Sequence, residues 1–302
     1  MDWMTGVVNS VGGGAYQVSV SPEDSPVEAY LRGRLKLQNR VGDRVVIGDR
    51  VAVVETSDGS YVIEKILPRE NAILRSRGSG VEIKVLVANV DRVLLVVAVK
   101  DPQPRKNFID RMLVLAESEG IKPVVVINKI DLADTKKEME CLSTIYKSVG
   151  YDVIRTSAET KEGIDHLAYE TKSGITALAG QSGVGKSSLI NCLDPNISLK
   201  TSEVSAKHGT GRHTTVRSRL IPFSNGGWLA DTPGFSNAGV KGLITRDDLD
   251  SCFPDFIPYI SGCQFRSCSH LHEPDCSVKQ ALLKGSILGS RFESYQVLYG
   301  EL

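Results

Sequence analysis

The sequence predicts a multi-domain α/β protein, in which a β-barrel precedes a doubly wound α/β domain and a C-terminal helical domain. Three observations support this. Short alternating strands without helices fill residues 1–67, and buried strands alternate with helices over residues 70–240. Half of the six cysteines crowd into residues 263–276, within a final domain at 241–302. The length of 302 residues fits at least two domains, at roughly 150 residues each.

The composition is ordinary for a soluble globular protein. Lys and Arg total 36, Asp and Glu total 36, and 41% of residues are apolar, which excludes a disordered chain or a fibre. The zero net charge gives no support for nucleic-acid binding, which must rest on local patches. The longest apolar run, 93–99, is far below the ~20 residues of a membrane helix, and no secretory signal begins the chain. Sparse cysteines fit a reducing compartment, so we expect a cytoplasmic protein with buried thiols at Cys141, Cys192 and Cys252.

The first region has the pattern of a small barrel. Alternating stretches at 6–11, 15–20, 28–37, 44–54 and 61–67 are separated by Gly and Asp turn signals. These stretches predict a five-stranded barrel, of which the OB-fold is the commonest binding type. An SH3-like barrel would give the same pattern.

The central region has the pattern of a parallel sheet. The apolar runs 92–99 and 122–127 are typical of strands buried on both faces, and 152–156 and 175–179 are further candidates. Helical spacing appears between these strands. Because open α/β sheets bind ligands at the carboxyl ends of their strands, we expect the site there.

A glycine-rich motif follows the strand at 175–179 and precedes a helical stretch. Residues 180–187 fit the P-loop pattern G-x-x-x-x-G-K-[ST], whose backbone amides wrap phosphates. Lys186 is predicted to reach the β- and γ-phosphates, and Ser187 to bind Mg²⁺. The predicted phosphate-binding set is Gly180, Gln181, Ser182, Gly183, Val184, Gly185, Lys186, Ser187 and Ser188.

Two further motifs select the base. Asn128, Lys129, Ile130 and Asp131 follow the strand at 122–127. The Asp131 carboxylate can accept from N1–H and the N2 amine of guanine, whereas adenine offers neither donor on that edge. Thr156 is followed by Ser157 and Ala158, which we predict as a second base contact. The combination predicts GTP rather than ATP.

The γ-phosphate side has its own motif. Asp231 ends an apolar strand and is predicted to hold Mg²⁺ through water, while the amide of Gly234 bonds the γ-phosphate. Thr214 or Thr215, which lie between the phosphate motifs, completes the magnesium shell. The predicted magnesium ligands are Ser187 and Thr215, with Thr214 as the alternative.

The order of the motifs indicates a circularly permuted P-loop GTPase domain. In Ras-like GTPases the P-loop comes first and the base motifs last, but here residues 128–131 and 156–158 precede the P-loop. The cyclic order is unchanged, so the same strands can form the same site. The chain is cut after the motif at 231–234, which therefore leads directly into the C-terminal domain.

With a barrel before these motifs and a Cys/His cluster after them, the whole chain resembles the circularly permuted small-ribosomal-subunit biogenesis GTPases, the RsgA/YjeQ family. The resemblance implies an OB-fold that touches ribosomal RNA and a zinc domain that docks on the small subunit. It also implies GTP hydrolysis that the subunit stimulates during late maturation. We expect a monomer with no membrane partner.

The C-terminal cluster has the donors of a metal site. Cys263, Cys268, His270 and Cys276 make a Cys₃His set, which is a closed tetrahedral zinc site in many proteins. His272 is an alternative ligand by spacing, and the family pattern favours His270. With no open position, one zinc ion would be structural.

The hydrolytic group is the least determined. Ras-like enzymes orient the attacking water with a Gln just after the DxxG motif, but Phe235 stands there. The resemblance suggests His213 as the catalytic group, beside Lys186, Thr214 and Thr215; an exposed or RNA-contacting histidine is equally compatible. Phe235 also keeps open a GTP-gated binding module with incidental hydrolysis.

Two stretches are locally basic. One contains Arg32, Arg34, Lys36, Arg40, Arg44 and Arg50, and the other contains Lys200, Lys207, His208, Arg212, His213, Arg217 and Arg219. Such patches suit phosphate contacts with RNA, although most charge runs are solvated surface.

Overall fold

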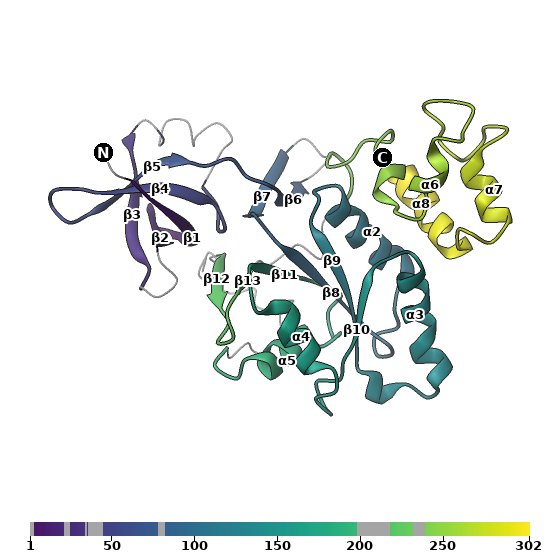
Figure 1. Ribbon diagram of the computed structural model, residues 1–302, viewed down its shortest axis with the longest axis horizontal. Coiled ribbons are helices and arrows are strands. Elements are labelled where there is room, and N and C mark those ends of the chain that lie inside the picture. The colour runs from purple at the N-terminus through teal and green to yellow at the C-terminus, as the bar shows by residue number, and fades with distance from the viewer. Residues whose placement is uncertain are drawn as a thin grey trace, which may run out of the picture.

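The computed structural model describes residues 3–20, 25–33, 35, 45–77, 82–197, 218–231 and 239–302. Figure 1 shows the barrel in purple and blue at one end, the central α/β domain in teal and green, and the helical C-terminal region in yellow at the other end. The sequence therefore predicted the order and type of the three parts correctly.

The N-terminal strands close into a barrel. They are β1 (Met4–Gly12), β2 (Ala15–Ser19), β3 (Val27–Leu31), β4 (Arg50–Glu55) and β5 (Tyr61–Ile66). The order is β1-β2-β3-β5-β4, and β1 also pairs with β4. Because β5 lies parallel to β3 and between β3 and β4, the barrel is not a simple meander. This Greek-key order is that of an OB-fold, which decides between the two barrel types.

The segment before β4 differs from the sequence prediction. The alternation predicts a strand from residue 44, but β4 begins at Arg50 and residues 45–49 lie against the next hairpin. Ile47 forms a bridge with Val87, and a Cβ on Gly48 would lie 2.1 Å from the carbonyl oxygen of Ala88. Gly48 also has a φ of 83°, so glycine is required on both counts. This contact attaches the barrel firmly to the following unit.

That following unit is a hairpin that was not predicted from the sequence. Strands β6 (Ala72–Arg77) and β7 (Glu82–Ala88) form a separate two-stranded sheet. It lies between the barrel and β8 along the chain, and Figure 1 labels its two strands, drawn in blue. The apolar residues Ile83, Val85 and Val87 alternate along β7, and this period of two was the signal that could have found it.

The central domain is a six-stranded portion of a larger sheet. Its strands are β8 (Arg92–Ala98), β9 (Lys122–Asn128), β10 (Asp152–Arg155), β11 (Ile175–Ala179), β12 (Arg219–Pro222) and β13 (Trp228–Asp231). The order is β10-β9-β8-β11-β13-β12, parallel except for β12. Strand β12 also pairs with β1 at Arg219 and Ser10, which joins this sheet to the barrel.

Helices cover both faces of the parallel strands. They are α2 (Lys106–Glu117), α3 (Lys136–Ser148), α4 (Ile164–Thr171) and α5 (Lys186–Leu193), with the short turn η1 (Ile130–Leu132) before α3. Along β8, Val93 and Leu95 face the core that contains α2, whereas Leu94 and Val96 face the core that contains α4 and α5. Burial on both faces explains why β8 is continuously apolar.

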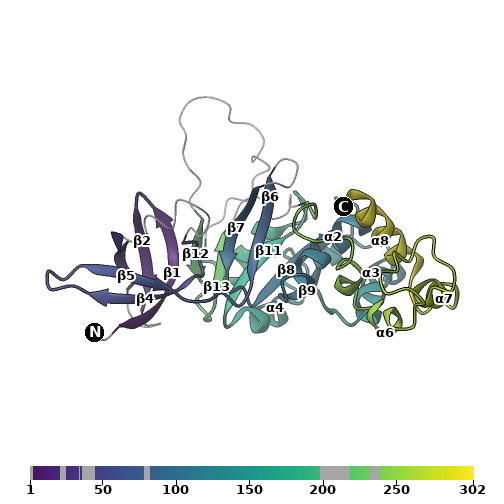
Figure 2. The ribbon, with the colours of Figure 1, turned by 90° about the horizontal axis from the view of Figure 1, so that it is seen from above.

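The C-terminal region packs on α2. It contains η3 (Asp250–Cys252), α6 (Ile257–Ile260), α7 (Ser277–Leu283) and α8 (Gly289–Glu301). Figure 2 shows α8 beside α2, and one apolar cluster runs from Met112 on α2 to Phe253 and Tyr295. The region therefore shares its core with the central domain. None of the helices in the described part of the chain has the length and apolar character needed to span a bilayer.

Candidate functional site

The P-loop residues connect β11 to α5 with a glycine-dependent backbone. Three glycines of this loop have positive φ values: 146° at Gly180, 82° at Gly183 and 92° at Gly185. Residues with a Cβ rarely adopt such values. A Cβ on Gly180 would lie 2.3 Å from the carbonyl oxygen of Val96, and one on Gly185 would lie 2.3 Å from Nδ2 of Asn128. The loop therefore presents its backbone at the N-terminus of α5, where anions bind.

The Lys186 ammonium lies across this loop. Its Nζ donates to the carbonyl oxygens of Gly180 at 2.6 Å and Gln181 at 2.8 Å. Burial lowers the pKa of Lys186 from its ordinary value. Both carbonyl acceptors are neutral. The negatively charged oxygens of a phosphate would therefore stabilise the charged ammonium more strongly than these carbonyls do.

Asn128 joins the three predicted nucleotide motifs. Its Nδ2 donates to the carbonyl of Val184 in the P-loop at 2.8 Å, and its Oδ1 accepts from the Thr156 hydroxyl at 3.2 Å. Asn128, Val184 and Thr156 are all buried. Segments far apart in the sequence are thus fixed to each other at the carboxyl ends of β9, β10 and β11.

The two base motifs contact each other directly. The Ser157 hydroxyl donates to Oδ1 of Asp131, while the Thr160 amide donates to Ser157 Oγ at 3.0 Å. Asp131 is exposed and Ser157 is buried. The carboxylate is therefore oriented by a residue on its protein side, and its other side is open to a ligand. Ala158, half-buried, follows Ser157, and its carbonyl accepts from the Cys192 thiol at 3.4 Å.

Two supporting positions were not predicted from the sequence. The Lys129 ammonium donates to the carbonyl of Asp101, in the loop after β8. Gly163 has a φ of 73°, and a Cβ there would lie 1.9 Å from the carbonyl oxygen of Arg155. The glycine lets the 156–163 loop close over the end of β10. The only trace of this loop closure in the sequence is an isolated glycine, and a backbone acceptor such as Asp101 leaves no trace.

The γ-phosphate side is described only in part. Asp231 ends β13, one position beyond the pairing of Ala230 with Ala177 on β11, so it lies beside the strand that enters the P-loop. Arg219 Nε is 3.7 Å from Asp231 Oδ2. The remaining residues predicted for this side lie outside the described residues: His213, Thr214, Thr215, Gly234 and Phe235.

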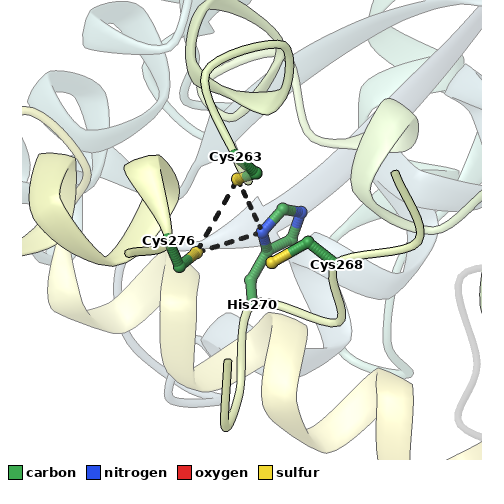
Figure 3. Close-up of side chains that lie close together, drawn as sticks. All are labelled: Cys263, Cys268, His270 and Cys276. Atoms are coloured by element: carbon green, nitrogen blue, oxygen red, sulfur yellow. Dashed lines mark hydrogen bonds between the residues drawn. The ribbon is translucent and has the colours of Figure 1, made fainter. Parts of the chain in front are cut away.

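The four predicted metal ligands lie together, as Figure 3 shows. The ligand atoms of Cys263, Cys268, His270 and Cys276 are all within 4.8 Å of one another. His270 Nδ1 is 3.3 Å from Cys276 Sγ and 3.6 Å from Cys263 Sγ, and those two sulfurs are 3.9 Å apart. The cluster could hold a metal ion.

The surroundings of the cluster favour a cation. His270 is fully buried and its Nε2 lies 3.1 Å from Asp250 Oδ2, as a carboxylate commonly orients a metal-bound imidazole. Burial raises the pKa of the Cys268 thiol to about 12, so a positive charge is needed to hold a thiolate there. His272 is exposed and outside the cluster, which places His270 with the thiols.

Two of the other three cysteines do not match the expectation of buried thiols. Only Cys252 is buried; Cys192 is half-buried, and Cys141 is exposed. Cys141 lies on α3, whose sheet-facing positions are taken by Leu142 and Tyr146, so a neighbouring position is left in solvent.

The basic barrel patch is neutralised where it is described. Arg32 is paired with Glu64, and Arg50 with Glu70. The other four cations of that stretch lie outside the described residues, as do those of the second stretch apart from Arg219. In the described part, the patch therefore adds no unpaired arginine for phosphate contact.

Comparisons with known proteins agree with this geometry. A family model described as RsgA GTPase matches residues 66–241. A protein of Agathobacter rectalis named small ribosomal subunit biogenesis GTPase RsgA is 36% identical, with 99% of this chain and 98% of the relative covered. A protein of the same name from Gemmatimonas aurantiaca is 39% identical, with 99% and 97% covered.

Solved structures agree as well. The crystal structure of YjeQ from Thermotoga maritima matches with a TM-score of 0.83 and 35% identity, covering 100% of this chain and 99% of that one. The structure of YloQ, described as a circularly permuted GTPase, matches with a TM-score of 0.78 and 29% identity, covering 99% and 95%.

Proposed function

The chain belongs to the RsgA GTPase family and is therefore a GTP-hydrolysing P-loop enzyme, and we propose that its hydrolysis serves the maturation of the small ribosomal subunit. The curated relatives are named for that process. The subunit would be both the binding partner and the activator of hydrolysis.

The observation that carries the nucleotide assignment is the placement of Asn128. It bonds the P-loop through Val184 and the second base motif through Thr156, so phosphate and base loops form one unit. Asp131, oriented by Ser157, would accept from guanine N1–H and the N2 amine. The Ala158 amide would meet guanine O6, and Lys129 and Ile130 would brace the base.

The phosphates would occupy the loop from Gly180 to Ser188, with Lys186 released from its carbonyl partners to bind β- and γ-oxygens. Hard oxygen donors suit Mg²⁺. Asp231 ends β13, and Ser187 lies in the first turn of α5, the helix that follows the adjacent strand β11 through the P-loop. Ser187 with Thr215 or Thr214 would hold the ion, which would neutralise charge on the phosphates. Gly234 and His213 would act at the γ-phosphate and the attacking water.

The metal of the Cys₃His cluster would be a structural zinc ion. A tetrahedron with Zn–S bonds of ~2.3 Å and Zn–N bonds of ~2.1 Å has S–S edges of about 3.8 Å and S–N edges of about 3.6 Å. The corresponding separations here are 3.9 Å between Cys263 and Cys276, and 3.3–3.6 Å from these sulfurs to His270. All four positions are filled by protein, so this ion would have no catalytic role.

The ribosome-facing surfaces would be the barrel, through ribosomal RNA, and the C-terminal domain. The protein would act as a cytoplasmic monomer. Co-sedimentation of the full chain with purified small subunits tests this assignment. We expect association with a non-hydrolysable GTP analogue and less with GDP. Equal absence of association with both nucleotides would contradict the assignment of the partner and leave the GTPase assignment intact.

A further inference from the structure

The largest fully buried side chain in the described structure carries a charge and lies between the central and C-terminal domains. Arg291, on α8, is fully buried. Its Nη1 donates to Asp110 Oδ1 on α2 at 2.6 Å, and its Nη2 and Nε donate to Asp255 at 2.8 and 3.3 Å. Burial alone would lower its pKa, but Asp110 and Asp255 more than offset this and raise it, so the guanidinium remains charged.

Arg291 also contacts the aromatic side chains around it. The guanidinium carbon lies 4.6 Å from the ring centre of Phe253 and 5.9 Å from that of Tyr151. Asp110, in turn, lies close to Tyr146 on α3. Burial raises the pKa of the Tyr146 hydroxyl, and the nearby charge of Asp110 raises it further. The arginine therefore contacts α2 directly and Tyr151, the residue before β10. It reaches α3 only indirectly, because Asp110 lies beside Tyr146.

These three elements adjoin the base motifs, or a loop that contacts them, along the chain. Helix α2 follows the loop whose Asp101 carbonyl accepts from Lys129. Helix α3 follows Asp131, and the Tyr151 amide donates to the carbonyl of Tyr146 at its end. Strand β10 runs from the residue after Tyr151 straight to Thr156 and Ser157. The contacts of Arg291 thus lie at or beside elements that continue along the chain into the base-reading loops, with β10 between Tyr151 and Thr156.

We propose that Arg291 is a positioning residue for guanine recognition: through α2, α3 and β10 it holds the Asp131 and Ser157 loops in register from the C-terminal domain. A charge triad at this depth fixes geometry more than it adds stability, because desolvation offsets much of the attraction. Loss of the guanidinium leaves Asp110, whose pKa burial raises, without its counter-charge and removes the hydrogen bonds that tie α8 to Asp110 and Asp255, so we expect the elements around it to loosen. This inference rests on the proposed base contacts of Asp131.

The test compares guanine with hypoxanthine. ITP lacks the N2 amine, which would donate a hydrogen bond to the Asp131 carboxylate. The ratio of GTP to ITP affinity therefore reports how well that carboxylate is placed. In Arg291→Met we expect GTP and GDP affinity to fall equally, by roughly 2- to 30-fold, and the GTP/ITP ratio to fall with them. The KM for GTP should rise while kcat is unchanged, as for a contact made equally in ground and transition states. Arg291→Lys should recover part of the loss.

The matched control is Glu301→Gln, which breaks the partly exposed ion pair between Arg111 on α2 and Glu301 on α8. It weakens the same helix contact without touching Tyr151 or Asp110, and should keep the wild-type ratio. If Arg291→Met does not fold, Asp255→Asn loosens the guanidinium from the other side and should give the same change at smaller size.

Unchanged nucleotide affinity and an unchanged GTP/ITP ratio in a folded Arg291→Met or Asp255→Asn protein would overturn the proposal. If wild type itself fails to prefer GTP over ITP, the base contact of Asp131 is wrong, and the role of Arg291 falls with it. The two failures are distinguished by the wild-type measurement.

Discussion

The side-chain amide of Asn128 donates to the backbone carbonyl of Val184 across 2.8 Å in a buried position. The first residue ends β9 and the second lies in the P-loop, so the bond connects the loop that reads the base to the loop that holds the phosphates. A nucleotide bound to one of these loops is thereby placed against the other.

Replacing Asn128 with Ala should weaken both the fold and nucleotide binding. The change leaves the Val184 carbonyl and the Thr156 hydroxyl unpaired in a buried site, which costs about 1–3 kcal/mol of the free energy of unfolding. Denaturant unfolding and titration with fluorescent GDP measure the two effects. Asn225→Ala is the control, because Asn225 also donates to a carbonyl, that of Ala168 at 2.9 Å, but at an exposed position. Equal effects of the two variants would contradict the bridging role.

Asp131→Asn should change the preferred base. An amide donates where the carboxylate accepted, so affinity for GTP should fall and affinity for xanthosine triphosphate, whose 2-oxo group accepts, should rise. Competition binding with both nucleotides and ATP reports the change. Wild-type protein that binds ATP as tightly as GTP would show that Asp131 does not select the base.

Ser187→Ala should raise the Mg²⁺ concentration needed for GTP hydrolysis and lower the rate at saturation. The Ser187 hydroxyl is a proposed protein ligand of Mg²⁺, and a water molecule in its place would be held less firmly. GDP binding without Mg²⁺ serves as the internal control and should be unaffected. A wild-type Mg²⁺ dependence in this variant would place the ion on other ligands.

Removal of the metal should destabilise more than the C-terminal domain. Cys268 and Cys276 belong to the same apolar cluster as Phe253, Tyr295 and the α2 residue Met112. We therefore expect elemental analysis of Cys268→Ser to show the loss of one zinc ion per chain. The Tm at which the protein loses nucleotide binding should fall as well. Cys141→Ser, at an exposed free thiol, should keep both the zinc and the Tm. A metal-free wild-type chain with an unchanged Tm would contradict a structural ion.

The sequence points to those parts of the proposed site in which particular residue types are chemically required. The P-loop glycines, the Asn128–Asp131 motif and the Cys₃His set are of this kind, and the fold brings the members of each set together. The close approach of Gly48 to Ala88 depends on a backbone contact between distant segments, and the loop closure at Gly163 depends on a backbone approach to Arg155 at the end of β10, where the same loop begins. Such contacts leave only an isolated glycine in the sequence, and isolated glycines also occur in ordinary turns and helix ends.

The role of Arg291 was equally hidden. Its partners follow no motif spacing, because Asp110 lies on α2 and Asp255 lies in the turn before α6. A charged residue is also expected at the surface unless it is paired. In contrast, the missed β6–β7 hairpin was readable, because Ile83, Val85 and Val87 alternate as in a half-buried strand.

His213→Ala should remove most of the stimulation by small subunits while leaving GTP affinity nearly unchanged. The imidazole would act on the attacking water, which Phe235 cannot bind, and so would contribute only in the transition state. Single-turnover hydrolysis with and without subunits measures the effect, and fluorescent GTP-analogue binding is the control. Full stimulation in the variant would assign the water to another group.

GTP turnover by the full chain, measured with and without purified small ribosomal subunits, tests the central claim most directly. Because Phe235 cannot form a hydrogen bond to the attacking water, the free protein should hydrolyse GTP slowly. Groups supplied by a partner raise turnover by roughly 10³–10⁵ in other GTPases. We predict an increase of orders of magnitude on adding small subunits and none on adding large subunits. Identical turnover with and without small subunits would contradict the claim.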